Sequence, residues 1–364
     1  MHHPWLVPPA LLVLSLLACN GQSPSEAPST RSGEVVLELG DSALVVYQDS
    51  RGAHWFGSDG NGVVRYDGTS LVRFTNAHGL SGNQVRQIQE DGDGHLYVST
   101  VGPPGGFGIS RFDGERFTTL VPVEAAGPGE GWELSPDDLW FQGFGTDDGP
   151  YRLDGETLVR LSFPRIALED VFRARFPNVS YSPYNVYAMH RDRSGAMWFG
   201  TGNLGACRYD GRSFQWITED ELTELEDGPS LGLRGIVEDE DGTFWLGNLL
   251  HRYDVRPSAA SSEDGAPWYR REPGPVDAEA PDVGNAYFMS GLRDRHGVTW
   301  TATYAQGVWS YDGAQLTHHP VRDEKGDVVT LFSIHEDRDG VLWVGSHAAG
   351  AWRLVDGRFE RFRP

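Results

Sequence analysis

The sequence contains very little cysteine. Its 364 residues include 2 cysteines, Cys19 and Cys207. A framework of several disulfides is therefore excluded. If Cys19 is modified, as argued below, no partner remains for Cys207, and the stability of an exported chain must come from packing.

Long apolar runs are also scarce. One run, Ala10–Leu17, lies near the N-terminus and is too short to span a bilayer as a mature helix. It is followed by the small residue Ala18, which is typical of a cleaved export signal. No second apolar run follows, so we expect no membrane-spanning helix and no route in this chain for signalling across a membrane.

Basic residues are outnumbered, with 30 Lys and Arg against 52 Asp and Glu and a net charge of −22 at pH 7. This balance argues against nucleic acid as a partner and against a broad surface for anionic lipids. The chain also lacks a Gly-x-Ser-x-Gly elbow, zinc-ligand spacing and a phosphate-binding loop. These absences favour a binding protein over an enzyme and support neither a metal nor a cofactor.

The segment Leu16-Leu17-Ala18-Cys19 resembles the lipobox of bacterial lipoproteins. The resemblance implies that Cys19 is lipidated and becomes the mature N-terminus, with several acyl chains for firm attachment. The residues before the apolar run include His2 and His3 but no Lys or Arg, which departs from that pattern. An ordinary secretory signal cleaved nearby is the alternative.

Residues 20–33 have no apolar periodicity and are rich in Ser, Pro and Gly, which indicates a flexible tether. The predicted organisation is a lipoprotein signal peptide over 1–18, lipidated Cys19 with a tether over 19–33, and one domain over 34–364. We expect the domain to be held by its lipid in the cell envelope, at the outer membrane or the cell surface.

Aromatic residues and glycines, by contrast, are abundant, and they recur in a pattern. Residues 331–362 predict four short strands, Leu331–Glu336, Leu342–Gly345, Gly350–Leu354 and Phe359–Phe362, separated by Asp-Gly or Gly corners. The same unit, Asp-x-x-Gly-x-x-(Trp/Tyr) followed by Arg-Tyr-Asp-Gly, occurs seven times, with one degenerate copy. Its aromatic positions are Trp55, Tyr97, Trp140, Trp198, Trp245, Trp300 and Trp343.

Repeats of four strands spaced by 42 to 58 residues predict an all-β fold, a seven-bladed β-propeller of four-stranded blades. In each copy the Asp carboxylate can accept backbone N–H groups across a tight turn in which Gly takes a positive φ. The large aromatic ring after the turn should pack between neighbouring blades. We therefore assign the repeat residues a structural role.

The stretches from Asn83 to Thr100 and from Trp198 to Gly211 resemble the two-component regulator propeller repeat, and the resemblance extends over roughly 44–362. In that family such propellers often form the extracytoplasmic sensor of hybrid histidine kinases. This chain departs from that pattern, since it reaches Pro364 without a transmembrane helix, a kinase or a DNA-binding segment. We therefore expect a stand-alone lipoprotein, for which the resemblance implies the fold more strongly than the signalling role. Fold alone does not give function.

The insertions fall on one side of the predicted ring. The Asp-x-x-Gly corners and the Asp-Gly corners share one face, which we call the turn face. The connections from the second to the third strand and from blade to blade share the other, which we call the loop face. All long insertions but one, at 257–268, lie on the loop face. Loops on a rigid scaffold are where binding sites are built.

Two insertions on adjacent blades supply candidate ligand-binding residues. One carries Tyr181, Tyr184 and Tyr187, and its aromatic rings either cap the channel or line a ligand site. The other is an acidic run with Glu221 and Glu224, which is either a solvated loop or an attractor of cationic ligands. Together they would suit a saccharide, a cationic peptide or a peptide end.

Two histidines, His190 and His335, occupy equivalent first-strand positions in blades 4 and 7. A metal-binding pair is one interpretation, but we expect ordinary strand residues there, because these blades face each other only across the channel. The sequence as a whole predicts a lipid-anchored, extracytoplasmic propeller that binds an unknown small ligand, glycan or protein partner through its loop face, as a sensor or interaction module. The alternative is a propeller lyase or hydrolase acting on an envelope polysaccharide or another envelope substrate.

Overall fold

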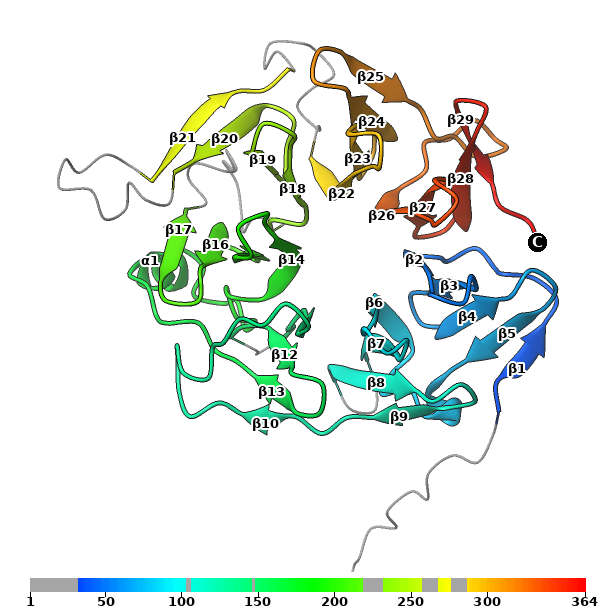
Figure 1. The fold of residues 1–364 in the computed structure, drawn as a ribbon, viewed down its shortest axis with the longest axis horizontal. Helices are drawn as coiled ribbons and strands as arrows, with labels where there is room; N and C mark the ends of the chain where they lie inside the picture. Colours follow the sequence, from blue (N-terminus) through cyan, green and yellow to red (C-terminus); the bar gives the residue numbers. More distant parts are fainter. Residues whose placement is uncertain (1–31, 103–105, 146–147, 219–231, 257–267, 276–286) are drawn as a thin grey trace, which may run out of the picture.

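Seven β-sheets form a ring around a central channel in the computed structural model (Figure 1). The structure describes residues 32–102, 106–145, 148–218, 232–256, 268–275 and 287–364. The predicted seven-bladed β-propeller is confirmed. In the described residues no helix is long and apolar enough to cross a membrane.

Each blade is built from consecutive strands. Blade 1 contains β2 (Val45–Gln48), β3 (His54–Gly57), β4 (Val63–Tyr66) and β5 (Leu71–Phe74), with β1 (Glu34–Val36) added outside β5. Blade 2 contains β6 (Gln84–Glu90), β7 (Leu96–Val101), β8 (Gly108–Phe112) and β9 (Phe117–Thr119). Blade 3 contains β10 (Val123–Glu124), β11 (Leu139–Phe141), β12 (Tyr151–Leu153) and β13 (Leu158–Arg160). Blade 4 contains β14 (Val186–Arg191), β15 (Met197–Thr201), β16 (Ala206–Tyr209) and β17 (Phe214–Ile217).

The remaining blades follow the same order. Blade 5 contains β18 (Ile236–Glu238), β19 (Thr243–Leu246), β20 (His251–Val255) and β21 (Tyr269–Pro273). Blade 6 contains β22 (Phe288–Arg293), β23 (Thr299–Thr303), β24 (Val308–Tyr311) and β25 (Leu316–His319). Blade 7 contains β26 (Leu331–Glu336), β27 (Leu342–Ser346), β28 (Ala351–Val355) and β29 (Arg358–Arg361). A 3-10 helix (Asn76–His78) and helix α1 (Leu168–Arg175) lie in the connections.

The corners of a blade form as the sequence predicts. In blade 7, the Asp337 carboxylate accepts the N–H of Val341 at 2.8 Å, and Gly340 closes the turn at φ 83°. At the second corner, Asp356 and Gly357 have φ 47° and 80°. Two successive positive φ values match the right-handed twist of the flanking strands, which favours Asp-Gly at this position.

The apolar core lies between blades, because each repeat aromatic packs on the next sheet. Trp55 of blade 1, for example, contacts the rings of Phe112 and Phe117 in blade 2 at centroid distances of 5.1 and 6.2 Å. Phe74 and Val85 complete this cluster. The repeat aromatic of blade 1 therefore packs between two blades.

Blade 3 reaches four strands by a different route. Its inner position has no regular strand, and β10 instead pairs in parallel with β13 at the outer edge. The physical reason is the degenerate turn: Leu134 stands six residues before Trp140, where the other blades have Asp. Gln87 and Gln89 of blade 2 take over part of the missing ladder by donating to the Trp140 carbonyl at 3.2 and 2.6 Å.

Blades 7 and 1 close the ring through side chains and one short bridge. Ala43 donates its N–H to the Ser346 carbonyl at 3.0 Å. The Gln48 N–H donates to His335 Nε2 at 3.2 Å, and an aromatic cluster that includes Phe56, Trp343 and Phe362 fills the contact. No strand of one blade enters the sheet of the other. We call this contact the seam.

A second set of blade-to-blade bonds lies on the turn face. The carboxylate that ends the first strand of one blade accepts a backbone N–H from the turn of the preceding blade. The bonds are Ser50 N–H to Glu90 at 2.7 Å, Arg193 N–H to Glu238 at 2.9 Å and Arg295 N–H to Glu336 at 3.0 Å. We call these bonds the turn latches.

Candidate functional site

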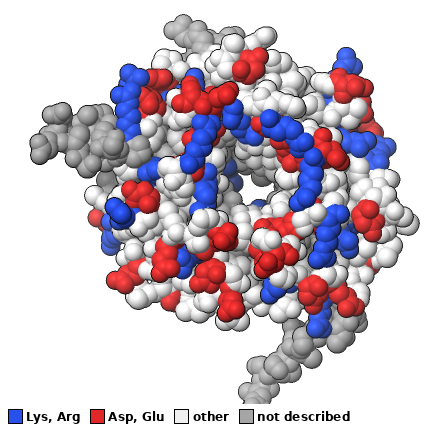
Figure 2. Space-filling view, viewed as in Figure 1, with Lys and Arg blue, Asp and Glu red and all other residues white. Residues whose placement is uncertain are grey.

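The central channel holds a cavity of about 590 Å³, lined mostly by the innermost residues of the blades. In Figure 2 the hole at the middle of the ring is bordered by interspersed acidic and basic side chains. Two arginines, Arg86 and Arg234, are the charged residues that line this cavity in the described part of the chain. Both lie toward the loop face, because each sits at the start of its blade.

Arg86 is placed by a short bridge between the first two blades. It follows Gln84, which pairs with Asp59 in the β3–β4 connection. The Arg86 guanidinium lies 3.7 Å from one Asp59 oxygen, while the other Asp59 oxygen is 3.2 Å from His347 Nε2. Burial lowers the pKa of Arg86 from its ordinary value; Asp59 opposes this change and Arg234 adds to it.

Arg234 is placed by an aromatic ring. Its guanidinium carbon lies 4.3 Å from the centroid of Tyr187, a cation–π contact. Tyr187 in turn is fixed from two sides: its carbonyl accepts a hydrogen bond from Gln142 Nε2 at 2.6 Å, and its ring lies 5.4 Å from that of Phe144. On this side of the cavity, Arg234, Tyr187 and Phe144 therefore hold one another in place.

A second group of aromatic rings lies across the channel from Tyr187 and Phe144. The Phe332 ring, which lines the channel cavity, is 5.9 Å from the ring of Tyr304 and 6.0 Å from that of His347. His347 contacts Asp59, and Asp59 contacts Arg86, so these aromatic rings are connected to the two arginines through Asp59. We call the residues Arg86, Phe144, Tyr187, Arg234, Phe332 and His347 the channel mouth.

The three tyrosines expected to form a ligand site are not brought together. Tyr187 lines the cavity. Tyr184 is 3% exposed in the core between blades 3 and 4, and its hydroxyl accepts the Ile166 N–H at 3.0 Å, so its ring presents no surface to a ligand. Tyr181 is half-buried, with its ring 6.5 Å from that of Phe172 on α1.

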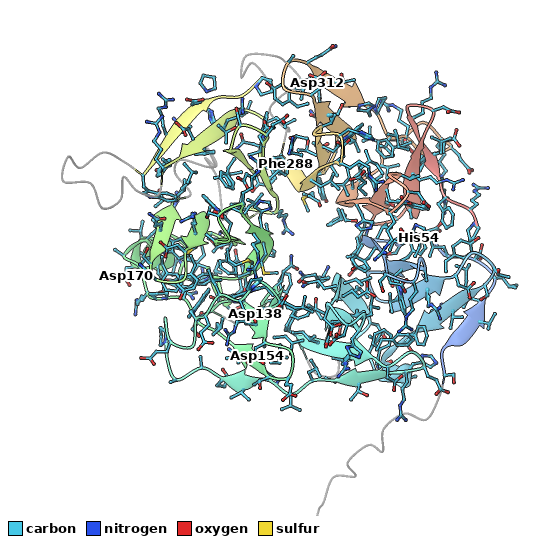
Figure 3. All side chains as sticks on the ribbon, in the orientation of Figure 1. His54, Asp138, Asp154, Asp170, Phe288 and Asp312 are labelled. Carbon is cyan, nitrogen blue, oxygen red and sulfur yellow. The ribbon has the colours of Figure 1, made fainter. Side chains whose placement is uncertain are left out.

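The insertion that carries these residues does not cover the channel. Helix α1 lies at the outer rim of blade 4 in Figure 1, and Figure 3 places Asp170 of this helix far from Phe288, which lies near the central opening. Within the insertion, Phe172 packs on Phe176 at 5.4 Å. Cys19, Glu221 and Glu224 lie outside the described residues.

The repeat residues have the structural contacts that were expected, together with one that was not. Six of the seven aromatic residues donate a side-chain hydrogen bond to the Asp that opens their turn, at 2.7–3.1 Å: Trp55, Tyr97, Trp198, Trp245, Trp300 and Trp343. Trp140 of blade 3 has no such partner. The Asp carboxylate thus joins the turn to the core between the blades.

The two histidines considered for a metal pair contact neighbouring blades instead. His190 lies 3.8 Å from Glu238 of blade 5, and His335 accepts the Gln48 N–H of blade 1. Among the described residues, no group of three or more His, Cys, Asp or Glu side chains gathers where a metal ion could be held.

The fold and these repeated corners define the class of protein: a propeller assembled from one sequence unit. The family model described as two component regulator propeller matches residues 79–102, 180–203 and 323–348. The chain therefore carries two component regulator propeller repeats, as the sequence predicted. No curated protein matches the chain.

Solved structures resemble the chain at low sequence identity. The extracellular domain of BT4673 from B. thetaiotaomicron, described as a one component system, matches with a TM-score of 0.58 at 20% identity. That match covers 89% of this chain and 40% of BT4673, so this chain spans less than half of that relative. A streptogramin B lyase matches with a TM-score of 0.59 at 14% identity, and the match covers 90% of this chain and 98% of the lyase. Virginiamycin B lyase from Staphylococcus aureus matches with a TM-score of 0.58 at 14% identity, and the match covers 88% of this chain and 100% of that lyase.

Proposed function

We propose that this chain is an extracytoplasmic sensory or interaction module that binds a ligand at the loop-face end of its channel. The observation that carries the proposal is the channel mouth, where Tyr187, Arg86 and Arg234 line one cavity with aromatic neighbours. The turn face, in contrast, repeats one hydrogen-bonded corner around the ring. The similarity to the extracellular domain of BT4673 supports a location outside the cytoplasm.

The binding site is tested by removing the Tyr187 ring. A panel of saccharides and short peptides is titrated against the full chain, and binding is followed by the shift in melting temperature, since a ligand that binds only the folded state stabilises it. Tyr187→Ala should abolish the shift given by any ligand in the panel, whereas Arg338→Ala on the turn face should retain it. If a ligand still raises the melting temperature of Tyr187→Ala but no longer that of Arg338→Ala, the site lies on the turn face and the proposal is wrong.

The proposed attachment rests on the lipobox-like segment ending in Cys19. Lipidation there would keep the propeller at a membrane surface with a tether of residues 20–33. Cys19→Ser should move the protein from the membrane fraction to the soluble envelope or medium after a high-salt wash. If the variant remains with the membranes, the lipid assignment fails.

A lyase is the second candidate function, and one observation favours it. His347 Nε2 lies 3.2 Å from Asp59 at the channel mouth, a pair suited to moving a proton. The structural similarity to streptogramin B lyase makes quinupristin, the compound present in one structure of virginiamycin B lyase, a rational probe. Cleavage detected by mass spectrometry in the wild type and lost in His347→Asn would support the lyase; an intact compound would rule out cleavage of this substrate and favour the binding role.

A further inference from the structure

Given the ligand-binding role proposed above, on which this inference rests, we propose that the channel mouth takes a small organic oxyanion, a carboxylate or a phosphate or sulfate ester. Arg86 and Arg234 would pair with its negative charge, and Tyr187 and Phe144 would face its body. The cavity of about 590 Å³ falls in the usual range for small-molecule sites, about 300–1,000 Å³.

Charge is the first argument. The protein carries a net charge of −22, yet the described residues that line the channel cavity include two arginines and no acidic side chain. A cleft of one sign with low-dielectric walls focuses its field and raises the local concentration of the opposite charge. Asp59 lies beside Arg86 and offsets part of this charge, but the described charges at the mouth remain net positive, which favours anions in an otherwise acidic molecule.

The second argument is the state of Arg86. Its side chain is 30% exposed, and its guanidinium donates no hydrogen bond within the described part of the chain. The nearest carboxylate oxygen, on Asp59, is 3.7 Å away, beyond hydrogen-bond distance. A planar guanidinium offers five N–H donors in a fork that matches a carboxylate or a phosphate.

The third argument is preorganisation. Arg234 lies over the Tyr187 ring at 4.3 Å, and the bond from Gln142 Nε2 to the Tyr187 carbonyl fixes the residue that carries that ring. Stacking uses the face of the guanidinium rather than its N–H edge. A ligand therefore meets a cation that is already held against an aromatic ring, and less side-chain entropy is lost on binding.

Arg86 and Arg234 also repel each other, because two like charges in one partly buried cavity disfavour each other. Burial is the main cause of the lowered pKa of Arg86; Asp59 opposes this change and Arg234 adds to it. An oxyanion between the arginines would remove that repulsion. Arg86 differs from a structural arginine such as Arg208, whose Nε lies at hydrogen-bond distance from Asp192, 3.0 Å, because the Asp59 oxygen beside Arg86 is 3.7 Å away.

The test compares anionic probes with a neutral analogue. Glucuronate, glucose 6-phosphate and glucose share a sugar body and differ in their charged group, so the first two probes distinguish a carboxylate from a phosphate ester. Each is titrated against the full chain at low ionic strength, with sodium chloride at matched ionic strength as the baseline. Melting temperature gives the apparent dissociation constant. Because salts also act on stability in general, each shift is compared with that of the variants.

The expected result is that at least one anionic probe stabilises the wild type and glucose does not. Arg86→Gln and Arg234→Gln should each raise the apparent dissociation constant at least tenfold, and Arg338→Gln on the turn face should leave it unchanged. Without a ligand, Arg86→Gln should melt no lower than the wild type, which a structural role would not allow.

Two outcomes would overturn the anion assignment. One is that neither anionic probe stabilises the wild type beyond the chloride baseline; the other is that the shifts survive in both arginine variants. A neutral ligand whose binding depends on Tyr187 but not on the arginines would leave the proposed function standing while this inference fails.

Discussion

At the scale of single residues, one carboxylate in each repeat has several tasks. In blade 4, Asp192 accepts the Ala196 N–H with one oxygen, and the indole N–H of Trp198 and the guanidinium of Arg208 with the other, at 3.0 Å each. Burial raises the pKa of Asp192, but hydrogen bonds from Ser194, Trp198 and Ala196 together with the charge of Arg208 outweigh it and hold that pKa below its usual value. The turn and the core between the blades therefore depend on the same ionised group.

The first prediction compares two tryptophans that differ in one hydrogen bond. Trp198→Phe removes a donor from the buried Asp192, whereas Trp140→Phe removes an indole N–H that has no partner. The same Asp192 oxygen keeps its bond from Arg208, so the variant loses one hydrogen bond to a charged group, which is worth about 1.5–3 kcal/mol. Trp198→Phe should therefore lower the free energy of unfolding by about that much more than Trp140→Phe. Urea unfolding measures the difference. Equal losses would show that the indole–carboxylate bond adds nothing.

At the scale of elements, neighbouring blades are joined on the turn face as well as through their cores. Glu336 at the end of β26 accepts the Arg295 N–H and, at 2.6 Å, the Arg295 Nε–H. The Glu336 side chain is 15% exposed, whereas the Arg295 turn that donates to it is exposed. The turn latches thus add directional bonds to a contact that is otherwise apolar.

The second prediction tests a turn latch against an ordinary surface ion pair. Glu336→Ala should cost about 1.5–3 kcal/mol, because it removes hydrogen bonds to a charged carboxylate that is itself mostly buried. Glu336→Gln, which keeps an acceptor oxygen, should recover most of that loss. The control is Glu324→Ala: Glu324 is 72% exposed and pairs with Arg363, and exposed pairs contribute about 0–1 kcal/mol. Equal midpoints in urea for the two alanine variants would contradict a role for the latch.

Features of a blade that depend on residues close together in the sequence could be predicted. Asp337, Gly340 and Trp343 act within seven consecutive residues, so their spacing alone reveals the turn. Blade 3 could be predicted less completely, because the groups that complete its inner edge, on Gln87 and Gln89, are 53 and 51 residues away from Trp140. The turn latches were missed for the same reason.

The site could be predicted only in part. Long loops pointed to the loop face, and Tyr187 does line the channel cavity there. Tyr184 belongs to the core because its ring stacks on Phe163 at 5.9 Å, a contact that loop length does not reveal. Arg86 and Arg234 carry no motif, and the one sequence signal for them is a basic residue at the start of a first strand in an acidic protein.

At the scale of the whole molecule, the seam contains a titratable group. His335 accepts the Gln48 N–H with Nε2, which requires the neutral ring. Burial lowers the pKa of His335 from 6.5 to about 4; Asp337 opposes this change and His54 adds to it. The unfolded chain therefore binds a proton near pH 6.5, while the folded chain resists it down to about pH 4.

The third prediction follows from that sign. Stability from the neutral His335 is complete above about pH 6.5 and is lost as the pH falls toward 4, by on the order of 3 kcal/mol. His335→Gln keeps an acceptor for Gln48 and removes the titration, so its unfolding free energy should fall less steeply over this range. His318→Gln, at an exposed position, is the control. An unchanged pH slope in His335→Gln would contradict the assignment.

The seam has a consequence for how such a ring can change in size. Blade 1 and blade 7 are each complete within one stretch of chain, and Gly345 lets the backbone at Ala43 come so close that an added Cβ would lie 2.4 Å from its carbonyl oxygen. No blade is assembled from both ends of the domain. The number of blades is therefore set by the angle at which neighbouring blades pack, and not by the path of the chain. Duplication of one whole repeat would leave the same two complete faces to meet at the join. Gain or loss of a blade is thus a single genetic step that needs no new closure.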